Sequence, residues 1–199
     1  MPRRTPPRPR RGSPDDTRER LVEAAATVFN EIGYFATDSN KLARAAGYSP
    51  GTFYQHFPDK RAVFLAAYER WVEDEVGDLG ARRLAAVDPA ARARTFARVV
   101  VAHHRRWGVL RASLRALVLT DDVVHDYVLA RRRRQLAGLA ALRRQLALPP
   151  GTRADDWSLL LLLERVADSI AWGEAAALGV PVAGLERALI RALSALFGG

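Results

Sequence analysis

The fold is decided by a stretch near the N-terminus that reads LARAAGYSPGTFYQHFPDK over residues 42–60. A short helix is expected to end at Gly47, because glycine favours the left-handed conformation that stops helices. A second helix begins within two residues, since Ser49 can cap it and Pro50 suits the first helical position. Pro58 limits this second helix to about two turns. Two short helices joined by a tight turn containing glycine are typical of a helix-turn-helix.

Helical signals continue along the chain on both sides of this motif. Ser13 and Asp16 form a capping-box-like start for a helix over 14–33, and Thr37 is the cap candidate of the next helix. Asp59 can cap a helix that continues to about residue 77 or 80. No stretch alternates as a β-strand does, so the predicted fold class is all-α with about nine helices. The last five are expected at 88–107, 109–119, 121–147, 153–178 and 182–197.

Composition limits the class of protein. The chain has 199 residues, a net charge of +9 and no cysteine, which excludes disulfides, thiolate catalysis and cysteine-based zinc sites. No apolar run approaches the roughly 18 residues of a spanning helix, so we expect a soluble, cytoplasmic protein with no membrane partner. Residues 1–12 hold four prolines and five arginines. We interpret them as a disordered arm that either contacts phosphates or is an inert tail, followed by a DNA-binding domain over 13–75 and a second domain over 81–199.

The second helix of the motif has a polar outer side. Phe53 and Phe57 are spaced i, i+4 and turn inward, which leaves Thr52 and Gln55 free to contact base edges and Gly51 free to approach DNA closely. Residues 15–60 contain five basic and seven acidic residues, so charge alone leaves an ordinary solvated face equally open. The candidate DNA contacts are Ser49, Pro50, Gly51, Thr52, Tyr54, Gln55, His56 and Lys60, with Ser39, Asn40 and Arg44 on the preceding helix.

This motif also resembles a known family. Ala46-Gly47, Gly51-Thr52-Phe53-Tyr54, His56-Phe57 and Lys60 are similar to the N-terminal DNA-binding domain of TetR/AcrR-type transcriptional regulators, over about residues 15–75. The resemblance implies an all-helical dimer whose C-terminal domain binds a small molecule. A basic contact common in the family is absent here, because Asn40 occupies that position. The resemblance also implies that five residues face DNA: Thr37, Thr52, Tyr54, His56 and Lys60.

The C-terminal half offers candidate ligand contacts. Glu164 and Asp168 share a helix face with apolar residues, and buried carboxylates need partners. These positions could line a cavity, although an ordinary core with satisfied polar members is the alternative. No metal site and no cofactor is predicted. The candidate ligand-binding residues are Phe96, His103, Trp107, His125, Arg132, Trp157, Leu161, Glu164 and Asp168.

The last two predicted helices carry apolar stripes. The family resemblance favours their use as a homodimer face, and an intramolecular core is the alternative. The stripes consist of Leu159, Leu162, Leu163, Val166, Ile170 and Gly173 on the first helix, and of Leu185, Leu189, Leu193 and Phe197 on the second.

The residues and the resemblance together predict a ligand-responsive transcriptional regulator. We expect a repressor that binds a palindromic operator in double-stranded DNA as a homodimer and is released by a partly apolar small molecule, with the helix after the motif as the coupling element. A DNA-binding protein of chromosome organisation or cell division, without an effector, is the alternative. An enzyme is not expected, because His103 and His104 point about 100° apart on a helix and no phosphate-binding loop or nucleophile elbow occurs.

Overall fold

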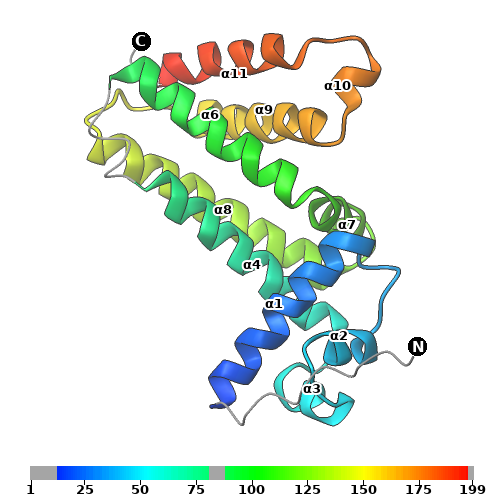
Figure 1. Ribbon diagram of the computed structural model, residues 1–199. Coiled ribbons are helices and arrows are strands. Elements are labelled where there is room, and N and C mark those ends of the chain that lie inside the picture. The colour runs from blue at the N-terminus through cyan, green and yellow to red at the C-terminus, as the bar shows by residue number, and fades with distance from the viewer. Residues whose placement is uncertain (1–12, 81–87, 197–199) are drawn as a thin grey trace. The chain divides into compact units, whose positions relative to one another are not determined.

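The computed structural model describes residues 13–80 and 88–196, and within these ranges it is entirely helical (Figure 1). The all-α prediction is therefore confirmed, with ten helices in the described ranges in place of about nine. The predicted arm over residues 1–12 lies outside the described residues. No helix in the described ranges is both long and apolar enough to cross a bilayer. The helices are α1 (Pro14–Ile32), α2 (Ser39–Ala45), α3 (Pro50–His56), α4 (Lys60–Leu79), α6 (Pro89–Arg106), α7 (Gly108–Val118), α8 (Asp122–Gln145), α9 (Arg153–Ala171), α10 (Glu174–Ala177) and α11 (Val182–Leu196).

Side-chain caps set the starts of the first helices. Ser13 and Asp16 form the reciprocal capping box predicted for α1. The cap of α2 is Asp38, whose Oδ1 accepts a hydrogen bond from the backbone N–H of Lys41 at 2.8 Å. The assignment of that cap to Thr37 was therefore wrong by one residue. Aspartate and threonine are both good cap residues, so the sequence alone could not separate two adjacent candidates.

One compact unit of the chain comprises residues 13–72 together with Val109–Ala116. Its core is aromatic: the rings of Phe29 and Phe64 meet edge to face with centroids 5.0 Å apart, and Tyr34 contacts Phe64 in the same way at 5.1 Å. Edge-to-face pairs add to the free energy gained by burial. This core joins α1 to the first part of α4, and the two short helices of the motif lie beside them (Figure 1).

Part of α7 belongs to the same unit. The Ser113 hydroxyl accepts a hydrogen bond from the backbone N–H of Tyr34 at 3.0 Å, and the side chain of Asn30 accepts one from the N–H of Leu110 at 3.4 Å. Tyr34 follows Gly33, which adopts a positive φ of 80° and ends α1. The turn between α1 and α2 is therefore held by a helix that lies some 79 residues further along the chain.

The second compact unit comprises Glu73–Gly108 and the chain from Leu117 onward. Figure 1 shows α6, α9 and α11 packed together in this unit, and apolar side chains from all three form its core. Leu163 and Ile170 of α9 are buried there with Leu189 and Leu193 of α11. These four members of the predicted dimer stripes therefore serve an intramolecular core, which was the alternative interpretation. Phe197 lies outside the described residues.

The predicted helix over 153–178 is broken into two. The main helix ends at Ala171, and Gly173 adopts the left-handed conformation with φ 74° before the single turn of α10 begins. The continuous-helix prediction was wrong because the alanine-rich sequence after Gly173 favours helix by itself and masked the interruption.

Candidate nucleic-acid interface

Helix α3 divides cleanly into a buried side and a solvent side. Phe53 and Phe57 are almost completely buried, whereas Tyr54 is 54% exposed and Gln55 is also exposed. The Ser49 hydroxyl caps the helix by accepting from the N–H of Thr52 at 3.2 Å, and the two hydroxyl oxygens lie 3.0 Å apart. The cap thus fixes the first turn of α3, where a recognition helix contacts base edges.

Gly51 lies in this first turn and is not required by the packing of the free protein. A Cβ atom at this position would meet only the Ser49 hydroxyl, at an ordinary contact distance of 3.7 Å. Gly51 is exposed, and its neighbour Pro50 is exposed as well. The free structure would therefore accept alanine here, so any requirement for glycine must come from something that approaches the helix from outside.

The preceding helix presents a mixed polar edge. Asn40 and Arg44 are exposed, and Ser39 is half-buried. Asp38, at the start of α2, accepts a hydrogen bond from the backbone N–H of Lys41, and this bond lowers the pKa of its carboxyl group. Asp38 therefore stays charged near neutral pH, and the cationic side chains of Lys41 and Arg44 offset its negative charge.

Lys60 holds the motif together. Its Nζ donates hydrogen bonds to the backbone carbonyls of Tyr34 and Thr37, both at 2.9 Å, and lies 4.0 Å from the centre of the Tyr34 ring. Partial burial lowers the pKa of this amine. An ammonium group has three donors, so one remains for a phosphate. Lys60 thus ties the α1–α2 turn to the start of α4, a role that the sequence did not indicate.

The other two predicted contacts differ in exposure. His56 is half-buried at the end of α3. Thr37 is only 5% exposed, and its hydroxyl has no hydrogen-bond partner among the described residues. A contact between this hydroxyl and a phosphate would require a local rearrangement of the turn, so the DNA contact of Thr37 stays a prediction.

The nine candidate ligand residues differ in their surroundings. Phe96 and His103 are buried on α6. Asp168 is 1% exposed and pairs with the ring Nδ1 of His104 at 2.8 Å. The sequence therefore identified a carboxylate that needs a partner but not the partner itself, because the adjacent His103 was chosen for its place in an aromatic stripe.

Two other candidates, Arg132 and Trp157, line a surface groove between α8 and α9, and a third, Glu164, pairs with Arg132. Arg132 donates two hydrogen bonds to the carboxylate of Glu164, and its guanidinium lies 5.5 Å from the centre of the Trp157 ring. Trp157 and Arg132 line an open groove of about 480 Å³, together with Leu129 and Leu136. An aromatic ring, leucines and an oriented arginine are the elements of a site for a partly apolar ligand.

The remaining candidates lie apart from this groove. His125 is exposed, with its ring nitrogen 3.3 Å from the carboxylate of Asp126. Leu161 is 47% exposed, and Trp107 is half-buried, with the guanidinium of Arg106 5.3 Å from its ring centre. Within residues 13–80 and 88–196, no three histidine or acidic side chains are grouped closely enough to hold a metal ion.

Comparison with known proteins agrees with the motif. Residues 21–67 match the family model described as bacterial regulatory proteins, tetR family. The chain is 39% identical over 62 residues to the HTH-type transcriptional activator FasR of Mycolicibacterium smegmatis, a match that covers 31% of this chain and 28% of FasR. The matches to curated relatives span less than half of each relative's own length.

Solved structures extend the likeness of the fold beyond the motif. A crystal structure described as a TetR-family transcriptional regulator from Rhodococcus sp. superposes with a TM-score of 0.75 at 16% identity, covering 92% of this chain and 99% of the other. A transcriptional regulator of Saccharomonospora viridis in complex with choline gives 0.67 at 18% identity, covering 88% and 94%. The curated relatives of the N-terminal segment are named as transcriptional regulators. Residues 21–67 of this chain are therefore similar to the tetR family of bacterial regulatory proteins, and the fold of the chain is similar to that of TetR-family structures.

Proposed function

We propose that the chain is a ligand-responsive repressor that binds a palindromic operator as a homodimer. The observation that carries the proposal is the exposed side of α3. Ser49 caps this helix, Phe53 is buried in the core, and Gly51, Tyr54 and Gln55 are exposed to solvent. In this arrangement Gln55 reads base edges in the major groove and Tyr54 contacts the backbone. We place this activity in the cytoplasm, where operator DNA is accessible.

Dimerisation supplies the affinity that local charge does not. A helix-turn-helix with few basic residues gains little from counterion release, so two copies on one operator are needed for tight binding. We assign the dimer face to the outer side of α9 and the turn after α10. Exposed leucines at Leu161, Leu162 and Leu178 support this assignment, because apolar groups gathered on a surface favour association.

We assign the effector to the groove between α8 and α9 that is lined by Arg132 and Trp157. The groove accepts an apolar or aromatic body against Trp157, and a polar group of the ligand competes with Glu164 for Arg132. A ligand that displaces Glu164 from Arg132 breaks an ion pair of two hydrogen bonds. The ligand then binds more tightly to the conformation without this pair than to the conformation with it, and so shifts the population between the two.

The coupling path follows the chain itself. Helix α4 begins in the unit that carries the motif and ends in the unit that carries the groove, so it is the element that transmits a shift between them. Effector binding would favour a state in which the two α3 helices no longer match successive major grooves, about 34 Å apart. The relative FasR is named an activator, so activation is the alternative sign of regulation.

The test is selection from a randomised duplex library with the purified full chain. The proposal predicts an enriched palindrome, and the Gln55→Ala variant should relax the preference at matched positions of both half-sites. A non-palindromic or sequence-independent product would contradict homodimeric operator binding and favour a structural DNA-binding role.

The effector is tested separately. A metabolite panel is screened by thermal shift with and without the selected duplex, since a ligand that binds the folded state raises its melting temperature. A hit should release the duplex, and Trp157→Ala should remove both the shift and the release. Duplex binding that no ligand changes would contradict the effector arm of the proposal.

A further inference from the structure

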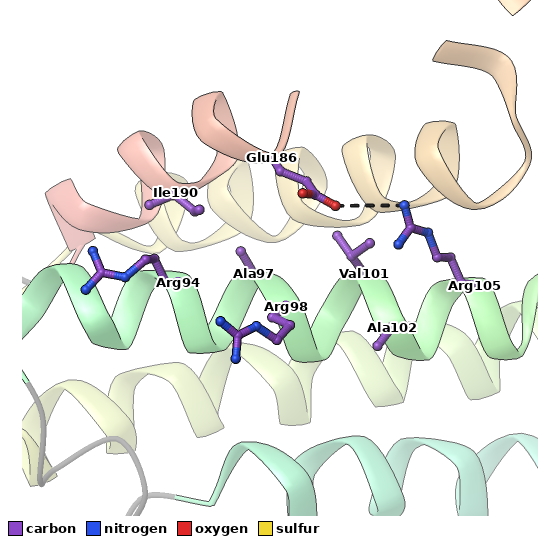
Figure 2. Close-up of a pocket in the computed structure, with 8 residues that line it drawn as sticks. All are labelled: Arg94, Ala97, Arg98, Val101, Ala102, Arg105, Glu186 and Ile190. Atoms are coloured by element: carbon purple, nitrogen blue, oxygen red, sulfur yellow. Dashed lines mark ion pairs between the residues drawn. The ribbon is translucent and has the colours of Figure 1, made fainter. Parts of the chain in front are cut away.

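A second groove lies in the C-terminal unit, between α6 and α11. It has a volume of about 240 Å³, and three arginines of α6 line it together with Glu186 and Ile190 of α11 (Figure 2). None of its residues lines the groove at Trp157. The volume is below the roughly 300–1,000 Å³ of pockets for drug-sized ligands, so its occupant must be small.

The charge of this groove is not balanced. Three of its four charged side chains are cationic: Arg94, Arg98 and Arg105 stand against Glu186 alone. Arg105 forms a long ion pair with Glu186, in which the guanidinium nitrogen lies 3.8 Å from the carboxylate oxygen (dashed line in Figure 2). Arg98 forms no ion pair or hydrogen bond within the described parts of the chain. The backbone N–H of Ala91 lowers the pKa of Asp88 at the start of α6, and the charge of Arg94 adds to this effect.

The spacing of two of these arginines suits one anionic group. Arg94 and Arg98 are four residues apart on α6, which brings their side chains to neighbouring positions on the helix surface. Like charges at this spacing destabilise a helix, and an anion between them relieves the repulsion. Guanidinium groups bind carboxylates and phosphates with paired hydrogen bonds, which makes such an anion the natural occupant.

The floor beside these arginines is apolar. Ala97 and Val101 of α6 line it between the charged positions, and Ile190 faces them from α11 (Figure 2). Ile190 is half-buried, so part of its side chain is still available to a ligand. A short hydrocarbon chain laid on this floor would be stabilised by removal of its apolar surface from water.

We propose that this groove binds a small amphipathic anion: a single carboxylate or phosphate group held by Arg94 and Arg98, with a short aliphatic chain running along Val101 and Ile190 toward the Arg105–Glu186 pair. The site is distinct from the proposed effector groove and does not depend on DNA binding. An occupant would join α6 to α11 and stabilise the C-terminal unit.

The test is direct titration of the full chain, without DNA, by calorimetry and thermal shift. Octanoate is the probe, acetate carries the same head without a tail, octanol carries the tail without charge, and octyl phosphate exchanges the head. We expect octanoate or octyl phosphate to bind and to raise the melting temperature, with the better of the two identifying the head group. Equal effects of octanol, or of acetate, would overturn the proposal.

The chain provides a matched control for the arginines. Arg187 and Arg191 are also four residues apart, but they lie on α11 and do not line the groove. The Arg94→Gln/Arg98→Gln variant should weaken binding of the better probe by roughly tenfold or more, since it removes the charged hydrogen-bond donors of both arginines. The Arg187→Gln/Arg191→Gln variant has the same net charge and should bind as the wild type does.

Further measurements separate binding in the groove from attraction by net charge and from contact between copies of the chain. Ala102 is an exposed lining residue, so Ala102→Trp should fill the groove and abolish binding without disturbing the core. Equal weakening in both arginine variants would mean that net charge alone attracts the probe and would overturn the proposal. A fall in molecular mass for Arg94→Gln/Arg98→Gln, measured by light scattering, would overturn it in favour of a contact between two chains.

Discussion

The two units of the molecule differ in the burial of the residues that the sequence proposes as functional. In the N-terminal unit the functional candidates Tyr54 and Gln55 project from a helix whose other side is locked in the core. In the C-terminal unit the candidates Phe96 and Asp168 are themselves part of the buried interior. A motif with fixed spacing predicts which side of a helix is exposed and available to a partner. An apolar stripe with polar members predicts only which side of a helix is buried.

The largest effect is expected where the C-terminal unit buries the hydrogen-bonded pair of His104 and Asp168. Asp168→Ala removes the carboxylate that pairs with the ring Nδ1 of His104 in a nearly water-free environment, so the free energy of unfolding should fall by roughly 1–3 kcal/mol. Glu164→Ala, on the same helix one turn earlier, breaks a more exposed pair and should cost clearly less. Urea denaturation of both variants measures the difference, and equal losses would contradict the distinction between core and surface carboxylates.

The N-terminal unit should respond in the opposite manner. Tyr54→Ala is expected to lower the affinity for operator DNA by at least about tenfold, or about 1.4 kcal/mol. Its free energy of unfolding should change by less than about 0.5 kcal/mol, because the side chain is exposed. Fluorescence anisotropy and urea denaturation measure the two quantities. Tyr54→Phe is the control that separates the hydroxyl from the ring, and a Tyr54→Ala protein that unfolds easily would place Tyr54 among the structural residues.

A smaller change at Gly51 sharpens the same contrast. Gly51→Ala meets no obstacle in the free protein and should leave stability unchanged or raise it by up to about 1 kcal/mol. Operator affinity should nevertheless fall several-fold, because the new methyl group stands between the helix and the DNA. Unchanged affinity in the anisotropy assay would mean that the first turn of α3 does not approach DNA closely.

The smallest expected effect is common to both units. Hydrogen bonds from backbone N–H groups at helix starts lower the pKa of Asp38 and of Asp88. A carboxylate with a lowered pKa contributes stability above its unfolded pKa and loses that contribution as the pH falls through the folded value. Asp88→Ser keeps a cap that does not titrate, so its stability should decline less than that of the wild type between about pH 5 and pH 2. Parallel acid dependence of the two proteins would contradict this role.

The sequence predicted most of the helices because caps and glycines mark their ends. The capping box at Ser13 and the cap at Ser49 were located correctly, and the outward position of Tyr54 followed from the burial of Phe53. The hydrogen bonds from Lys60 to the backbone carbonyls of Tyr34 and Thr37 were not predictable. They depend on the shape of the turn between α1 and α2, which residue types alone do not specify.

Partners distant in sequence were equally beyond the pattern. The Ser113 hydroxyl accepts a hydrogen bond from the backbone N–H of Tyr34, 79 residues away in the sequence. Asp168 pairs with His104, 64 residues away, and not with the adjacent His103. Helical periodicity assigns each residue to a face of its own helix, but the angle at which two helices cross decides which of two neighbouring histidines meets a carboxylate.

The most direct measurement is the affinity of the purified wild-type chain for duplex DNA from the intergenic region beside its own gene, as a function of salt. The account predicts saturable binding of two chains per duplex that exceeds binding to a shuffled duplex of the same composition and weakens as salt rises. Equal affinity for the two duplexes, or no binding at low salt, would contradict the claim that α3 is a recognition helix.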